Sequence, residues 1–226
     1  MRPLVLLEKV GQIPVYRHHG IEFGVDILAT KGFGSSSQLW SAAETISEWL
    51  DTGQNIQLIV CADFDPSGCD WSRAAQVELC QHLIRRHRGD YLLDDFSDER
   101  LATPDGAAAL LTEANSVLDG ALWGQLSIRR ELVNLDDLHR LGPAVALRAP
   151  NPNDTRTAKW LERFGFSAAQ ESVVEMDAIS PNVARVRLAV IYEELFDGSI
   201  SERVELQDRH REAITAALAS LDEDQS

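Results

Sequence analysis

The chain has 226 residues, of which 44% are hydrophobic and 25% charged, a composition typical of a soluble protein with one large domain, or one domain and an appendage. No apolar run approaches the roughly 20 residues that cross a bilayer, and the first apolar segment, Leu4 to Leu7, is too short for a signal peptide, so we expect a cytoplasmic protein without a membrane partner. The net charge of −15 disfavours nucleic-acid binding by the chain alone, because contacts to phosphate normally supply much of that affinity.

The first half of the chain alternates predicted strands with predicted helices. We expect strands over residues 4–7, 25–29 and 56–62, and a short turn or helix over 11–20. Longer helices are predicted over about 38–50, after the second strand, and about 69–86, after the third. This order is typical of a parallel sheet whose strands are joined by right-handed crossovers.

The second half is less regular. It begins with an acidic insertion over about 90–124, followed by a predicted fourth strand over 126–132. Shorter elements then follow, with helices expected over 157–164, 182–196 and 201–221 and an extended segment over 173–178. We therefore predict an α/β, Rossmann-like domain over residues 1–197, with about four parallel strands flanked by helices, and a helical C-terminal extension over 198–226 that ends in an acidic tail.

The most informative motif, Asp63-Phe64-Asp65-Pro66-Ser67-Gly68, directly follows the third predicted strand. Open α/β sheets bind their ligands at the carboxyl ends of the strands, and two carboxylates at such an end suit a hard cation such as Mg²⁺. The Pro-Ser-Gly that follows predicts a sharp turn. The alternative is that Asp63 and Asp65 only cap this turn.

Several motifs in this order resemble the Toprim domain, especially that of topoisomerase VI A subunits and the related meiotic break-forming proteins. Glu8-Lys9 follows the first predicted strand, the stretch Thr30 to Ser35 (TKGFGS) follows the second, and the stretch Asp63 to Gly68 (DFDPSG) follows the third. The later stretches Asp154 to Arg156 and Glu175 to Ile179 are similar to elements of phage, plasmid and defence-associated Toprim proteins. The resemblance covers roughly residues 4–197.

The resemblance implies a catalytic centre built on carboxylates and lysines. Glu8, Asp63 and Asp65 would together hold one or two Mg²⁺ or Mn²⁺ ions. Lys9 and Lys31 would neutralise the phosphate that is cleaved. The alternatives are that Glu8 only pairs with one of these lysines, and that the lysines are ordinary solvated side chains.

Five further residues are weaker candidates. Glu175 and Asp177 would extend the metal cluster or position a water as general base, unless they form a solvated acidic turn. Gly32 and Ser35 would bind phosphate at a helix N-terminus, although such residues often cap helices and do no more. Arg73 would reach a phosphate, or else remain an exposed helix arginine.

By the same resemblance, the expected activity is metal-dependent cleavage of DNA phosphodiester bonds, by a nickase or endonuclease. We expect the chain to be the catalytic subunit of a larger complex, in which a protein partner supplies DNA-binding surface; a homodimer is possible. No tyrosine-bearing winged-helix domain precedes the first strand, so covalent strand passage is not expected. The main alternative is a non-catalytic Toprim scaffold that binds nucleic acid or a partner. An aspartate-nucleophile phosphatase fits less well, because that class carries its Asp-x-Asp on the first strand.

Overall fold

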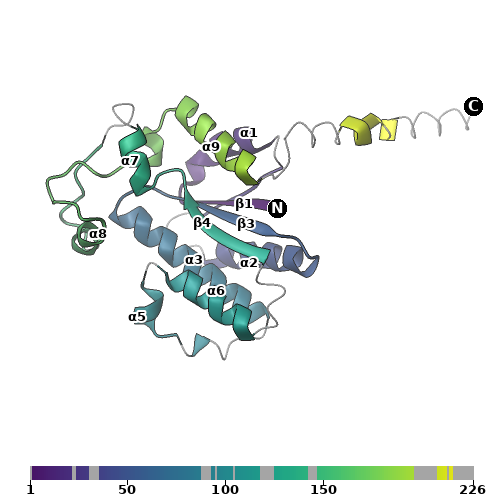
Figure 1. Cartoon of the computed structure of the whole chain (residues 1–226), viewed down its shortest axis with the longest axis horizontal. Coiled ribbons are helices and arrows are strands. Elements are labelled where there is room, and N and C mark those ends of the chain that lie inside the picture. The colour runs from purple at the N-terminus through teal and green to yellow at the C-terminus, as the bar shows by residue number, and fades with distance from the viewer. Residues whose placement is uncertain are drawn as a thin grey trace, which may run out of the picture.

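In the part of the chain that the computed structural model describes, four strands form one all-parallel sheet in the order β2-β1-β3-β4 (Figure 1). The described residues are 2–21, 24–30, 36–87, 93–94, 96–103, 105–117, 125–141, 147–195, 208–212 and 214–215. The strands are β1 (Arg2–Leu7), β2 (Asp26–Ala29), β3 (Ile56–Cys61) and β4 (Leu126–Glu131). The predicted α/β, Rossmann-like class is confirmed.

Helices cover both faces of the sheet, and each face has its own hydrophobic core. In β1, Leu4 and Leu6 point into one core while Val5 and Leu7 point into the other, as the two-residue period of a strand requires. One face is covered by α2 (Ser36–Asp51), α3 (Pro66–Arg86) and α6 (Gly106–Val117). The other is covered by α1 (Ile13–Gly20) and α9 (Pro181–Leu195), as Figure 1 shows.

Smaller elements border the carboxyl edge of the sheet. They are the 3-10 helices η1 (Val10–Gln12) and η6 (Met176–Ala178) and the short helices α5 (Asp98–Leu101), α7 (Leu135–Leu141) and α8 (Thr157–Phe164). An aromatic cluster joins α8 to the segment after β3. The ring of Phe64 lies 5.5 Å from that of Trp160 and 5.0 Å from that of Phe164, between centroids. This packing fixes α8 beside the 63–68 segment.

The strand order creates a switch point between β1 and β3. The chain places β2 on one side of β1 and then crosses back to place β3 on the other side. The crossovers on the two sides leave the strand ends in opposite directions, and ligands of open α/β sheets bind in the crevice that results. Glu8 and Lys9 follow β1, and Asp63 follows β3, so the sequence motifs converge on this crevice.

Two local predictions were wrong. Pro66-Ser67-Gly68 is not a separate turn before a helix at 69: α3 already begins at Pro66, because Asp65 caps it and proline suits the first helical position. The 173–178 segment is extended only around Val173 and Val174, which form isolated bridges, and then turns into η6. The predicted 201–221 helix lies mostly outside the described residues. Within the described part, no helix is long and apolar enough to cross a membrane.

Candidate functional site

Glu8 and Asp63 meet at the switch point. The backbone N–H of Glu8 extends the β1–β3 ladder by donating to the carbonyl of Cys61 over 3.1 Å. The Glu8 side chain then reaches across the crevice, and its Oε2 accepts a hydrogen bond from the backbone N–H of Asp63, also at 3.1 Å. The carboxylate after β1 is thus held against the first residue of the motif after β3.

Asp63 is the most enclosed carboxylate of the site, with only 7% of its surface exposed. Its Oδ1 accepts a hydrogen bond of 2.8 Å from the backbone N–H of Met176. Its Oδ2 forms an ion pair of 2.8 Å with Nζ of Lys9. Both oxygens of this carboxylate therefore have partners within the chain.

Asp65 has the capping role, one of the two roles that the sequence left as alternatives. Its Oδ1 caps α3 by accepting a hydrogen bond of 2.5 Å from the N–H of Gly68. Its Oδ2 has no hydrogen-bond partner among the described residues. The cap therefore fixes the carboxylate while leaving one oxygen available for a ligand.

Glu175 and Asp177, the two acids of the later motif, have different partners. Asp177 reaches the site, where its Oδ2 lies 3.1 Å from Nζ of Lys9 and its Oδ1 accepts a hydrogen bond from Nε2 of Gln12. Glu175 instead pairs with Arg148, with 2.8 Å between Oε1 and Nη1. Of the two acids that sequence reasoning treated as a pair, only Asp177 contacts the lysine.

A backbone bridge between Phe64 and Val174 holds the segment that contains Glu175 and Asp177 at the edge of the sheet. Phe64 and Val174 exchange two hydrogen bonds as an antiparallel pair, with N···O distances of 2.8 and 3.0 Å. This pairing places the N–H of Met176 over Asp63 and carries Asp177 to Lys9. Residues far apart in sequence are thereby brought to one edge.

The pKa values of Glu8 and Asp65 are shifted by burial and by neighbouring charges. Burial raises the pKa of Glu8, and the neighbouring charges of Asp63 and Asp65 raise it further. Burial likewise raises the pKa of Asp65, with a further contribution from Asp63. Burial alone would lower the pKa of Lys9, but its contacts with Asp63 and Asp177 outweigh this effect, so that the pKa is raised and the ammonium is retained.

Arg130 was missed by sequence reasoning, although it organises the backbone of the site. From the end of β4 its Nη2 donates to the carbonyls of Asp63, at 2.6 Å, and Ala62, at 3.0 Å, while its Nη1 donates to that of Gly68 at 3.3 Å. A basic residue at the carboxyl end of a parallel strand was the available signal. Gln12, which donates to Asp177, was also missed, and the sequence contains no signal that would have indicated it.

Gly68 allows the tight approach of α3 to the strand end. A Cβ at this position would lie 2.4 Å from the carbonyl oxygen of Asp63, much closer than real Cβ atoms come. Only glycine permits this contact.

Four predicted site residues remain. Lys31, Gly32 and Ser35 lie outside the described residues. Arg73 projects from α3, where its Nη2 forms an ion pair of 2.7 Å with Asp70 and its Nη1 donates to the carbonyl of Leu101 at 3.0 Å. It contacts none of the three carboxylates.

The chemistry of Glu8, Asp63 and Asp65, hereafter the carboxylate cluster, fits a hard divalent cation. All three supply oxygen donors, and a cation would offset both the burial and the mutual repulsion that raise the pKa values of Glu8 and Asp65. The described residues contain no group of three His, Cys, Asp or Glu side chains arranged to hold a metal ion. Lys9 occupies Oδ2 of Asp63, and a cation there would have to displace its ammonium.

Comparison with known proteins found no matching family model, no matching curated protein and no matching solved structure.

Proposed function

We propose that this chain is a Toprim-type nuclease that uses Mg²⁺ or Mn²⁺ to cleave phosphodiester bonds in DNA. One observation carries the proposal: Glu8, Asp63 and Asp65 converge at the β1–β3 switch point, where burial and, to a lesser extent, the neighbouring carboxylates raise the pKa values of Glu8 and Asp65. Such a concentration of carboxylates at a ligand-binding edge is costly unless a cation offsets it.

In this proposal, Glu8 and Asp65 are the residues best placed to hold the metal, together with Asp63 once Lys9 has moved from it. The bound ion would polarise the phosphodiester, activate a water and stabilise the leaving oxygen. Lys9 has a retained positive charge beside the cluster, so it can neutralise a non-bridging phosphate oxygen. Asp177 helps to orient Lys9 because it pairs with the same Nζ as Asp63, and Gln12 in turn holds Asp177.

The proposal includes a protein partner and a cellular location. A net charge of −15 makes a protein partner with additional DNA-binding surface part of the expected complex, with a homodimer as one form of it. We place the complex in the cytoplasm.

The ion pair between Lys9 and Asp63 favours a second candidate, a Toprim scaffold that binds nucleic acid or a partner without cutting. In that case the lysine, rather than a metal, permanently neutralises the buried aspartate. The two candidates differ in one measurable property, which is whether the carboxylate cluster binds a divalent cation.

The test is plasmid relaxation by the purified chain with Mg²⁺ or Mn²⁺, alongside Asp63→Asn. This change keeps the shape of the side chain and one acceptor oxygen for Met176, so the fold should persist. Asp51→Asn, at the exposed end of α2, is the matched control. Nicked or linear product from the wild type and the control, lost in Asp63→Asn and in EDTA, supports the nuclease. Cleavage that survives in Asp63→Asn would refute it, and absence of both cleavage and cation binding would favour the scaffold.

A further inference from the structure

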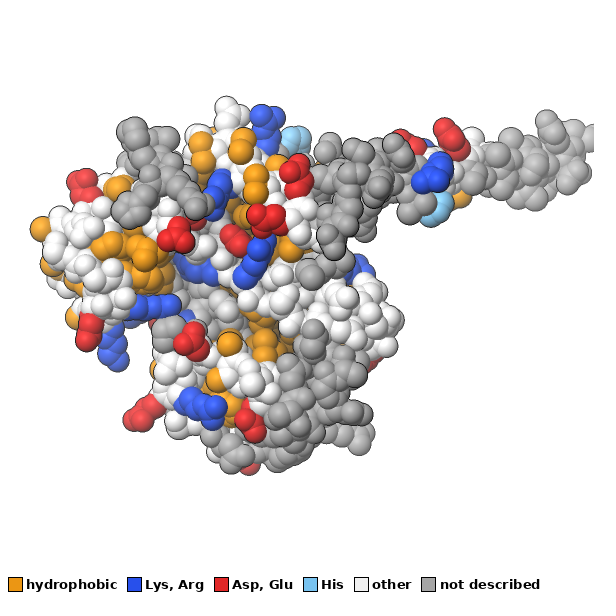
Figure 2. Space-filling view, viewed as in Figure 1, with side chains coloured by type: hydrophobic (Ala, Val, Ile, Leu, Met, Phe, Trp, Pro, Cys, Tyr) orange, Lys and Arg blue, Asp and Glu red, His pale blue; other side chains and the backbone are white. Residues whose placement is uncertain are grey.

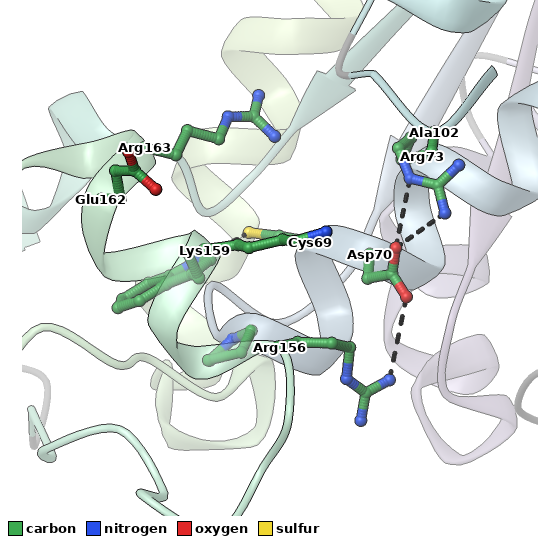
Figure 3. Close-up of a pocket in the computed structure, with 10 residues that line it drawn as sticks. Cys69, Asp70, Arg73, Ala102, Arg156, Lys159, Glu162 and Arg163 are labelled. Atoms are coloured by element: carbon green, nitrogen blue, oxygen red, sulfur yellow. Dashed lines mark hydrogen bonds and ion pairs between the residues drawn. The ribbon is translucent and has the colours of Figure 1, made fainter. Parts of the chain in front are cut away.

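A pocket of about 490 Å³ opens beside the carboxylate cluster, between the N-terminal end of α3 and helix α8 (Figure 3). Its apolar wall contains Pro66, Cys69 and Trp160. Pro66 directly follows Asp65, so the pocket begins one residue from the carboxylate cluster. The negative charge of Asp65 also acts on Arg156, which lines the pocket from the other side.

Basic side chains dominate the charged lining. Arg156, Lys159 and Arg163 come from α8 and its N-cap position, and Arg73 comes from α3; Asp70 and Glu162 are the acids. The spacing of three and four residues places the three cations of α8 on one side of the helix. In Figure 3 these side chains extend from α8 into the space that faces α3. In a chain of net charge −15, this concentration of cations runs against the overall balance.

Two of the four cations, Arg73 and Arg156, form ion pairs within the described part of the chain, and the other two do not. Asp70 forms ion pairs with Arg73, at 2.7 Å, and with Arg156, at 3.9 Å, and thereby connects the two walls of the pocket. Arg156 is further held by Asp154, at 2.8 Å. Lys159 and Arg163 are exposed and form no ion pair with any described residue. Their charges are therefore available to an external anion.

The basic surface continues beyond this pocket. Arg73 and Arg163 also line an adjoining hollow of about 340 Å³ that has no acid among the described residues of its lining, whereas a third hollow, of about 420 Å³, is lined along α3 by Arg73 and Arg85 but also by Glu78 and Asp98. Figure 2 shows blue side chains along the edge of the α8 region, where the surface is hollowed. Two adjoining hollows that share Arg73 and Arg163 suit a repeating, extended anion better than a single small one.

We propose that the pocket between α3 and α8 binds the phosphodiester backbone of duplex DNA and leads the strand to the carboxylate cluster. Lys159 and Arg163 supply the phosphate contacts, while Asp70 holds Arg73 and Arg156 in position at the pocket walls. This inference rests on the proposed function, which identifies the ligand as DNA. It adds the place on the chain where DNA binds.

The test is the salt dependence of binding to a fluorescein-labelled duplex of about 20 base pairs, measured by anisotropy in EDTA so that no cleavage occurs. The variant is Lys159→Ala with Arg163→Ala, since neither side chain has an ion pair to lose. The matched control is Arg17→Ala with Arg185→Ala, which removes the same charge from exposed positions of α1 and α9, helices that do not line the pocket.

Loss of two phosphate contacts lowers the slope of log K against log[salt] by about 1.8 and weakens binding about 60-fold at 0.1 M salt. We expect this change in the α8 variant and not in the control. Equal affinities of the two variants, or no binding by the wild type, would overturn the inference. Because the assay needs no cleavage, a chain that binds through the pocket but cuts no plasmid would refute only the proposed nuclease, and the pocket would stand.

Discussion

Gly68→Ala tests whether the close approach of α3 to β3 builds the site. An added Cβ would meet the carbonyl oxygen of Asp63 at 2.4 Å and its backbone C and N at 3.0 Å, and real Cβ contacts essentially never fall below 3.0 Å. All three neighbours are backbone atoms, so no flexible side chain can move aside. The Asp63 backbone must shift, although Glu8 and Arg130 both hold it.

Two opposing effects set the magnitude. Alanine improves helix propensity by about 1 kcal/mol over glycine, whereas strain from overpacking costs about 1–3 kcal/mol. The clash is with immobile backbone, so we expect strain at the upper end of that range and a net loss of about 1–2 kcal/mol. For a chain of this size each kcal/mol lowers Tm by about 2–4 °C. The affinity of the carboxylate cluster for Mn²⁺ should fall as well, because Asp63 moves.

Thermal and urea unfolding measure the loss of stability, and calorimetric titration with Mn²⁺ measures the site. Gly11→Ala is the matched control: it lies in η1 near the site, and an added Cβ there meets nothing within 4 Å. If Gly68→Ala were as stable as the wild type or more so, helix propensity would have prevailed and the reasoning about close approach would be refuted.

Four other changes have defined outcomes. Lys9→Met should raise the affinity for Mn²⁺ in calorimetry, because it frees Oδ2 of Asp63, and should lower plasmid cleavage; unchanged affinity would contradict a cation site there. Arg130→Met should cost about 2–3 kcal/mol in urea unfolding, since several carbonyls lose a charged donor, and Arg130→Lys should recover only part of this because the fork is lost. Trp160→Ala should cost about 3–5 kcal/mol by opening the aromatic cluster, again in urea. Burial lowers the pKa of His82 below its ordinary value of 6.5, so the unfolded chain binds the proton more tightly than the folded chain does. The contribution of neutral His82 to stability is therefore complete above pH 6.5 and is lost as the pH falls through the lowered pKa. Urea titrations across this pH range should show a weaker pH dependence for His82→Gln.

The sheet was predictable because its central strands are continuous apolar runs. Ile56–Cys61 is buried along its whole length, so pattern and structure agree. The ends of helices were less predictable: the Pro-Ser-Gly sequence is typical of a turn, and only the capping by Asp65 shows that it starts α3. From local sequence alone, the turn signal of Pro66-Ser67-Gly68 and the helix-capping signal of Asp65 could not be ranked.

The site was easiest to predict where a motif follows a strand. Glu8 and Asp63 were found in this way because parallel strands bring their carboxyl ends to one edge. Glu175 was grouped with Asp177 because they are neighbours in sequence, yet the backbone turns between them into η6 and Arg148 attracts the first. The contacts of Arg130 depend on where distant carbonyls point, which no periodicity encodes.

The bridge between Phe64 and Val174 also has a consequence for how the protein is made. The N–H that binds Asp63 comes from a residue 113 positions later, and Lys9 and Asp177 are 168 positions apart. Contacts that close such long loops form after local ones. On the ribosome, strands β1 and β3 can therefore pair long before Asp177 has been synthesised. The nascent chain carries its carboxylates early but completes their surroundings late, so that assembly of the site coincides with completion of the fold.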